Sequence, residues 1–305
     1  MRWFFSLALI FLTSVGHAAD RKRVVFVGDS ITQAAGYVYF IDAYLFAKQP
    51  NLEFELINIG LSSETVCGLS ENPQPRPNVN NRLARALELL KPDTVSICYG
   101  MNDGIYQPYD VKRFEAYRKG LMEGVVDRCE KAGSKVVLLT PFPFDPVPVA
   151  QKLVKKDAQN IGYGRFYEKY DDEVLQKYAD YILSQQSDSR KVVDIHKALK
   201  DYVAERRKMK PDYTVAGDGV HPNFEGHREA ARVILKSFFP NDVEGIDSFL
   251  NTVEKDRKDW FKLVQKRSKL MADAWRNVTM NPKSEVPAEV MKQAAALEKE
   301  IRAQK

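Results

Sequence analysis

The stretch KRVVFVGDSIT, residues 22–32, decides the fold. Four β-branched or aromatic residues, Val24 to Val27, follow two basic residues, and such a short apolar run predicts a strand. Gly28, Asp29 and Ser30 come directly after it, and residues of these types are typical of a tight turn. The sequence therefore predicts a strand that delivers Ser30 to its carboxyl end.

Further segments of the same kind alternate with segments of helical periodicity. Strands are predicted at residues 23–28, 54–60, 93–100, 135–140 and 191–195. Helices are predicted at residues 36–48, 81–90, 111–131, 165–183 and 224–239. Strands that alternate with helices imply right-handed crossovers, so we expect an α/β fold with a five-stranded parallel sheet covered on both faces.

Functional groups in such a sheet gather on the loops beyond the carboxyl ends of the strands. The first strand ends at Ser30, the second at residues 58–60 (Asn-Ile-Gly), and the third at residues 100–103 (Gly-Met-Asn-Asp). We expect these three segments to meet at one edge of the sheet.

Two proline-rich segments interrupt the alternation. Residues 70–80 carry three prolines, and residues 141–164 carry four prolines before a lysine-rich turn. Loops of this length are often functional, so we expect both to lie over the active edge. The alternative is that they are plain surface loops.

The two ends of the chain differ from this central part. Arg2, the apolar stretch 3–15 and the small residues Ala18 and Ala19 follow the order of a signal peptide, which we place at residues 1–19. We therefore expect a secreted or periplasmic protein. Residues 241–305 are expected to form a helical extension that packs on the preceding domain or on a partner. Its apolar residues with the spacing of one helical face are Trp260, Phe261, Leu263, Leu270, Met271 and Trp275.

Composition excludes several functional classes. The net charge is only +5, from 46 basic and 41 acidic residues, without a basic patch of the kind that binds nucleic acid. No apolar run after residue 20 approaches the roughly 18 residues that a bilayer requires, so stable membrane insertion is not expected. Cys67, Cys98 and Cys129 match no metal or redox spacing and allow at most one disulfide.

A serine hydroxyl needs an adjacent base, a group that orients the base, and donors for the oxyanion. Ser30 is the candidate nucleophile, and His221 is the candidate base. Asp218 precedes the histidine by three residues, so one turn of chain can present both. The nucleophile elbow requires glycine two residues before and two residues after the serine, and Ser30 departs from this pattern because Thr32 occupies the second glycine position.

Four segments together resemble the conserved blocks of the GDSL or SGNH hydrolase family, in the family's order. They are Val27-Gly28-Asp29-Ser30-Ile31-Thr32, Asn58-Ile59-Gly60, Gly100-Met101-Asn102-Asp103 and Asp218-Gly219-Val220-His221-Pro222. The resemblance covers roughly residues 22 to 240. It implies a flavodoxin-like three-layer α/β/α sandwich and ester hydrolysis through an acyl-serine intermediate.

The resemblance also assigns the site. It implies Ser30, Asp218 and His221 as catalytic residues and Ser30, Gly60 and Asn102 as oxyanion-hole donors, without a cofactor or a metal. The hydrolase domain is placed at residues 20–240.

Other polar residues near these blocks are expected to have supporting roles. Asp29 and Asp103 are expected to hydrogen-bond loops, and Gly100 to permit a tight turn. His196 is expected to be structural and His227 to face solvent. A metal site formed by Asp194, His196, Asp218 and His221 is the alternative, but it leaves Ser30 and Asn102 unexplained.

The ester itself is indicated only by analogy. The last block is similar to that of carbohydrate O-acetylesterases, and export fits a polysaccharide substrate. A lysophospholipase or thioesterase, and a glycan-binding protein without activity on the same fold, are the alternatives. Aromatic residues near the active edge suit sugar rings or an acyl pocket, and they are Tyr37, Tyr39, Tyr99, Tyr106, Tyr109, Phe142 and Phe144.

Overall fold

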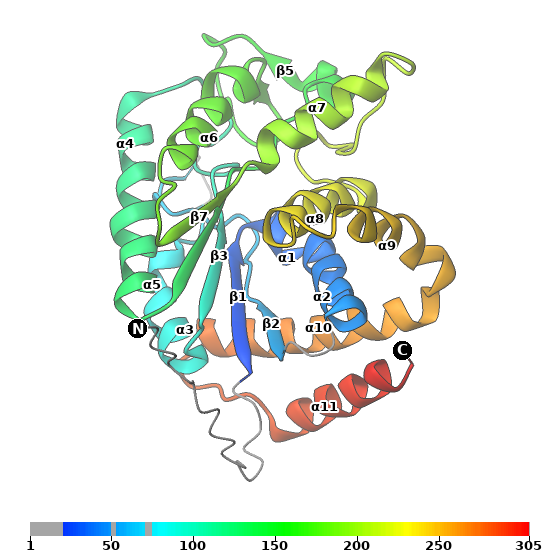
Figure 1. Cartoon of the computed structure of the whole chain (residues 1–305). Helices are drawn as coiled ribbons and strands as arrows, with labels where there is room; N and C mark the ends of the chain where they lie inside the picture. The colour runs from blue at the N-terminus through cyan, green and yellow to red at the C-terminus, as the bar shows by residue number, and fades with distance from the viewer. Residues whose placement is uncertain (1–20, 50–52, 71–74, 305) are drawn as a thin grey trace, which may run out of the picture.

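A five-stranded parallel sheet forms the centre of the computed structural model, which describes residues 21–49, 53–70 and 75–304 (Figure 1). The strands are β1 (Lys22–Gly28), β2 (Phe54–Asn58), β3 (Thr94–Cys98), β4 (Lys135–Leu139) and β7 (Arg190–Val193). Their order is β2-β1-β3-β4-β7, and every neighbouring pair is parallel. The five predicted strands and the three-layer α/β fold are therefore confirmed.

Helices cover both faces of this sheet. They are α1 (Ser30–Gln33), α2 (Gly36–Lys48), α3 (Leu83–Leu90), α4 (Val111–Lys119), α5 (Asp127–Lys131), α6 (Gln176–Leu183), α7 (Ile195–Arg207) and α8 (Phe224–Phe238). Figure 1 shows α2 and α8 on one side of the sheet and α3, α4 and α5 on the other. A π-helical stretch, η2 (Gly120–Val126), joins α4 to α5, so the helix predicted at 111–131 is continuous.

Two regions differ from the sequence-based expectation. The helix predicted at 165–183 begins only at η4 (Tyr170–Leu175), because β6 (Phe166–Tyr167) pairs instead with β5 (Leu153–Val154). Helix α7 follows β7 directly and was not predicted. Its amino terminus is capped by Asp194, whose side chain accepts a hydrogen bond from the Lys197 amide.

The two proline-rich segments contain short helical turns. They are η1 (Val79–Asn81), at the end of the first segment, and η3 (Val147–Lys152), within the second. The remainder of the described residues in both segments is loop, apart from β5 and isolated bridges.

The carboxyl-terminal region is helical, as predicted, and packs on the sheet. It comprises α9 (Val243–Asp256), α10 (Lys258–Met280) and α11 (Ala288–Ala303). Helix α10 runs along the edge strand β2 and also contacts α2 and α3 (Figure 1). Trp260, Phe261 and Met271 are buried in the common core. An uncovered edge strand invites pairing with another chain, so α10 protects this edge.

Helix α11 is fixed by ion pairs. Glu298 is mostly buried and binds Arg21, Arg267 and Arg302, with Arg267 at 2.8 Å and Arg302 at 3.0 Å. These contacts connect the last helix to the start of β1 and to α10.

Cys67, Cys98 and Cys129 are free thiols. No helix in the described part of the chain is long and apolar enough to cross a membrane. The predicted signal peptide lies outside the described residues.

Candidate active site

Ser30 lies where β1 ends and α1 begins. Asp29 caps this helix, and its Oδ1 accepts a hydrogen bond of 2.9 Å from the Ile31 amide. Burial raises the pKa of Asp29 to about 7, and the neighbouring Asp103 carboxylate adds to the rise. Asp29 therefore fixes the turn that presents Ser30, as the sequence predicts.

Asp218 and His221 share one turn of chain before α8. Asp218 Oδ1 accepts hydrogen bonds from the amides of Val220 (2.9 Å) and His221 (2.7 Å). Gly219 has a φ of 80°, and a Cβ atom there would lie 2.8 Å from the Asp145 carbonyl oxygen. The sequence Asp-Gly-Val-His thus folds into a tight turn that requires glycine at its second position.

Two neighbouring residues anchor this turn. The Asp145 amide donates to the Gly219 carbonyl at 2.8 Å, while the Asp145 carboxylate binds Arg207 (2.7 Å) and Thr214 Oγ1 (2.6 Å). On the other side, Asn223 caps α8, and its Oδ1 accepts from the Gly226 amide. The histidine therefore sits on a turn that is tied at both ends.

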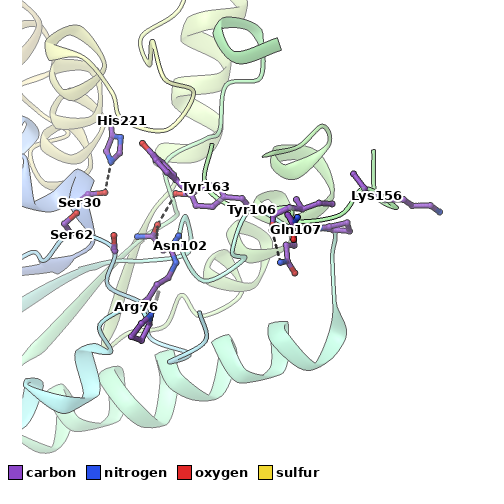
Figure 2. Close-up of a pocket in the computed structure, with 16 residues that line it drawn as sticks. Ser30, Ser62, Arg76, Asn102, Tyr106, Gln107, Lys156, Tyr163 and His221 are labelled. Atoms are coloured by element: carbon purple, nitrogen blue, oxygen red, sulfur yellow. Dashed lines mark hydrogen bonds between the residues drawn. The ribbon is translucent and has the colours of Figure 1, made fainter. Parts of the chain in front are cut away.

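Ser30, His221 and Asp218 form a continuous hydrogen-bonded chain. The Ser30 Oγ lies 2.8 Å from His221 Nε2, and His221 Nδ1 lies 2.7 Å from Asp218 Oδ2 (Figure 2). The carboxylate accepts from Nδ1–H, which leaves Nε2 as the acceptor for the serine hydroxyl. Partial burial opposes ionisation of Asp218, but its hydrogen bonds with His221 and Val220 outweigh that cost and hold its pKa below the ordinary value. The arrangement can deprotonate Ser30 through His221.

Gly60 does not join this group as the sequence suggests. Its amide donates to Asn58 Oδ1 at 2.8 Å, and its carbonyl accepts from Arg276 of α10 at 2.6 Å. The Asn58 Nδ2 donates in turn to the Thr32 carbonyl. The assignment of Gly60 as an oxyanion donor is therefore wrong, because its N–H group is already bonded. The Asn58-Ile59-Gly60 segment instead joins the β2 end to α1.

The loop after Gly60 supplies residues that sequence reasoning missed. Ser62 and Ser63 line the cleft beside Ser30, and Ser63 has a φ of 63°. No acceptor among the described residues bonds the Ser63 amide. The next residue, Glu64, is fully buried and pairs with Arg82 at 2.6 Å, which holds the loop in place. Because the left-handed conformation of Ser63 is rare outside glycine, no residue-type pattern indicated it.

Asn102 faces the same space from the end of β3. It is 3% exposed, and its Oδ1 accepts hydrogen bonds from Arg76 Nη1 (2.8 Å) and Tyr106 Oη (3.0 Å). Asp103 points away and accepts from the amides of Val66 (2.8 Å) and Cys67 (3.0 Å), so it supports a loop as predicted. Sequence reasoning did not single out Arg76.

A cleft of about 1050 Å³ opens from Ser30 and His221 (Figure 2). Both proline-rich segments contribute to its walls, through Pro75 and Arg76 on one side and residues 156–163 on the other. Besides Ser30, His221 and Asn102, its polar lining residues are Ser62, Ser63, Arg76, Gln107, Lys156 and Asn160. Tyr163 provides exposed aromatic surface next to the buried Tyr106, and Lys156 lies at the end away from Ser30. The volume greatly exceeds that of a short acyl group.

His196 and His227, the other two histidines in the described part of the chain, are both buried. His196 is buried, with Nδ1 3.1 Å from the Pro141 carbonyl, as expected of a structural residue. The prediction that His227 faces solvent is wrong, because the residue is only 5% exposed and its ring stacks on Tyr37. Burial lowers the pKa of His227 to about 4. Among the described residues, no three metal-ligating side chains meet in one group.

Known proteins of one hydrolase family are similar in sequence to most of this chain. Residues 26–229 match the model of the GDSL-like lipase/acylhydrolase family. An acetylxylan esterase from Geobacillus stearothermophilus is 24% identical over 236 residues, which cover 70% of this chain and 93% of that enzyme.

Two solved structures are similar to this chain at low sequence identity. A gut microbial diltiazem-metabolizing enzyme is 22% identical over 73% of this chain, with a TM-score of 0.53, and the match covers 48% of that chain. This protein thus spans about half the length of that enzyme. An aryl esterase from M. smegmatis is 20% identical, covering 72% of this chain and 99% of its own, with a TM-score of 0.46. The chain belongs to the GDSL-like lipase/acylhydrolase family and is a carboxylic ester hydrolase.

Proposed function

We propose that this protein is an exported serine esterase that removes acetyl groups from a carbohydrate, with Ser30 as nucleophile. The observation that carries the proposal is the chain of hydrogen bonds from Ser30 through His221 to Asp218, at 2.8 and 2.7 Å, at the mouth of a large polar cleft. The predicted signal peptide supports export.

The chemistry follows from the positions of the three side chains. His221 Nε2 takes the proton of Ser30 as Oγ attacks the ester carbonyl, and Asp218 stabilises the imidazolium that forms. The imidazolium then gives this proton to the departing alcohol oxygen. Water, activated by His221 in the same way, hydrolyses the acyl-serine and releases the acid. No step requires a cofactor.

The oxyanion of each tetrahedral intermediate needs donors beside Ser30 Oγ. We assign this role to the amides of Ser30 and Ser63 and to Asn102 Nδ2. Neither amide has an acceptor among the described residues, in contrast to the amide of Gly60. Among the residues that the structure describes, the one acceptor near Asn102 Nδ2 is the Glu64 carbonyl, at a long distance of 3.4 Å.

The cleft favours a large polar alcohol over a long acyl chain. Serine, asparagine, glutamine, arginine and lysine side chains line it, and aliphatic side chains are few. Hydroxyl groups of a sugar can form hydrogen bonds with such a surface, whereas a bound hydrocarbon chain would leave the polar groups of the cleft unpaired. The similarity to an acetylxylan esterase points to the same substrate class.

We also propose that residues 20–240 form the hydrolase domain and that residues 241–305 brace it. The bond from Arg276 Nε to the Gly60 carbonyl connects α10 with the loop that carries Ser63. The extension would therefore support the active-site loop.

The substrate proposal is tested with p-nitrophenyl acetate, p-nitrophenyl octanoate and acetylated xylo-oligosaccharides. We expect a higher kcat/KM on the acetate than on the octanoate, and release of acetate from the oligosaccharides. A preference for octanoate would favour the lipolytic alternative. Binding of the oligosaccharides without hydrolysis of any ester would favour a glycan-binding protein.

Tyr163 is expected to support a sugar ring in the cleft. Its side chain is 57% exposed and is held edge-on by Tyr106, with ring centroids 5.6 Å apart. Tyr163→Ala should raise KM for the oligosaccharides roughly 3- to 10-fold, the value of an aromatic contact. KM for p-nitrophenyl acetate should not change, and Tyr163→Phe should keep the oligosaccharide KM. Equal effects on both substrates would contradict this role.

A further inference from the structure

The amide of Asn102 can serve the oxyanion only if Nδ2, and not Oδ1, points at the reacting carbon. We propose that Arg76 and Tyr106 are positioning residues that hold Asn102 in this orientation and strengthen Nδ2–H as a donor. The inference rests on the proposed function, because it concerns the oxyanion site of the same reaction.

Both residues donate to the same atom. Arg76 Nη1 lies 2.8 Å and Tyr106 Oη 3.0 Å from Asn102 Oδ1. Arginine has donors only, so a flipped amide would place its NH₂ group against the guanidinium and lose that bond. A tyrosine hydroxyl can donate or accept, which means that Arg76 decides the orientation and Tyr106 supports it. Figure 2 shows Arg76 and Tyr106 converging on Asn102 from the side of the cleft opposite His221.

The backbone of residues 102–106 forms a turn that places the Tyr106 side chain next to Asn102. Ile105 and Tyr106 both have positive φ angles, 44° and 57°, a conformation that non-glycine residues rarely adopt. The turn is closed by a bond of 3.0 Å from the Ile105 amide to the Asn102 carbonyl. Tyr106 itself is 1% exposed and packs against Phe166 and Tyr170. Rare conformations of this kind persist where the surrounding structure enforces them, often at functional sites.

Arg76 is also fixed on the cleft wall. Its amide donates to Ser70 Oγ at 2.6 Å, and its guanidinium lies 5.6 Å from the centre of the Tyr106 ring. A charged donor on Oδ1 draws electron density from the amide, so the opposite N–H group becomes a stronger donor to developing negative charge.

The test is a double-mutant cycle on p-nitrophenyl acetate. Asn102→Ala should lower kcat roughly 10²- to 10³-fold if its amide is an oxyanion donor. Arg76→Met should lower kcat roughly 10- to 100-fold, and Tyr106→Phe, which keeps the ring, less. KM should change little in all three. In the Asn102→Ala background, Arg76→Met and Tyr106→Phe should have almost no further effect, because the residue through which they act is gone.

Two variants control for folding and charge. Arg118→Met removes a guanidinium that pairs with Glu115 on α4 at 2.8 Å and does not line the cleft, and it should leave kcat unchanged. Arg76→Lys keeps one charged donor and should recover part of the activity lost in Arg76→Met. Each protein is checked by its melting temperature and by the fraction of Ser30 that a fluorophosphonate labels after long incubation.

The outcomes separate this inference from the proposed function. Loss of activity in Asn102→Ala without loss in Arg76→Met and Tyr106→Phe would overturn the positioning role alone. Equal fold losses from Arg76→Met with and without Asn102 would overturn it as well. Normal activity of Asn102→Ala would instead overturn the oxyanion assignment, and the positioning role with it.

Discussion

Replacing Ser30 with alanine is expected to lower kcat for p-nitrophenyl acetate by roughly 10⁴- to 10⁶-fold, as in other hydrolases whose catalytic groups act as a unit. The variant lacks the Oγ that would form the acyl-enzyme, while His221 and the proposed oxyanion donors remain. KM should stay within a few fold, because the cleft walls are unchanged. Steady-state hydrolysis of purified wild-type and variant protein measures the loss.

Ser62→Ala is the matched control for this experiment. Ser62 lines the same cleft, and its backbone amide donates a hydrogen bond to Gln33 Oε1. The Ser62 hydroxyl has no hydrogen bond with any of the described residues. The control should retain most of the activity. Near-normal turnover by Ser30→Ala would remove Ser30 from the mechanism and leave the esterase activity to be explained by another group.

His221→Ala is expected to have an effect of the same size, roughly 10⁴- to 10⁶-fold in kcat. Without the imidazole, nothing among the described residues lies in the position of the base 2.8 Å from Ser30 Oγ. The Ser30→Ala/His221→Ala double variant should be no slower than either single variant, because the two side chains act in one step. The measurement is kcat of the three variants on p-nitrophenyl acetate.

His227→Phe provides the comparison for this second prediction. His227 lies behind the site, buried against Tyr37 and Phe142. Because the ring of His227 is neutral and buried, replacing it with phenylalanine should change mainly the melting temperature and leave the activity largely intact. A loss of activity in His227→Phe as large as in His221→Ala would contradict the assignment of the base.

The sheet could be predicted because its strands carry their signal locally. Each is a short apolar run between charged or turn residues, and the alternation with helices fixes the parallel topology. The start of the helix predicted at 165–183 could not be read in this way. Phe166 and Tyr167 pair with Leu153 and Val154, a contact that depends on the fold of the whole loop.

Two errors had signals that were available in the sequence. His227 precedes Ala230, Ala231 and Ile234 at helical spacing, which places it on the buried face of α8. Asp194 lies at the position of a helix cap, so α7 could have been predicted from it.

The loop at residues 58–63 shows what a sequence motif cannot predict. The Asn58-Ile59-Gly60 segment marks the correct strand end, but the bond from the Gly60 amide to Asn58 turns that N–H group away from the cleft. Ser63 reaches the cleft through a left-handed backbone, and Arg76 through a loop whose path depends on tertiary contacts. Serine and arginine are common residues, so neither could be identified by type.

Labelling the folded protein with a fluorophosphonate and locating the adduct by peptide mass spectrometry tests whether Ser30 is an activated nucleophile. We expect one adduct per chain on Ser30, no adduct in Ser30→Ala, and loss of ester hydrolysis in proportion to labelling. An adduct on another serine, or full labelling of Ser30 with unchanged hydrolysis, would contradict it.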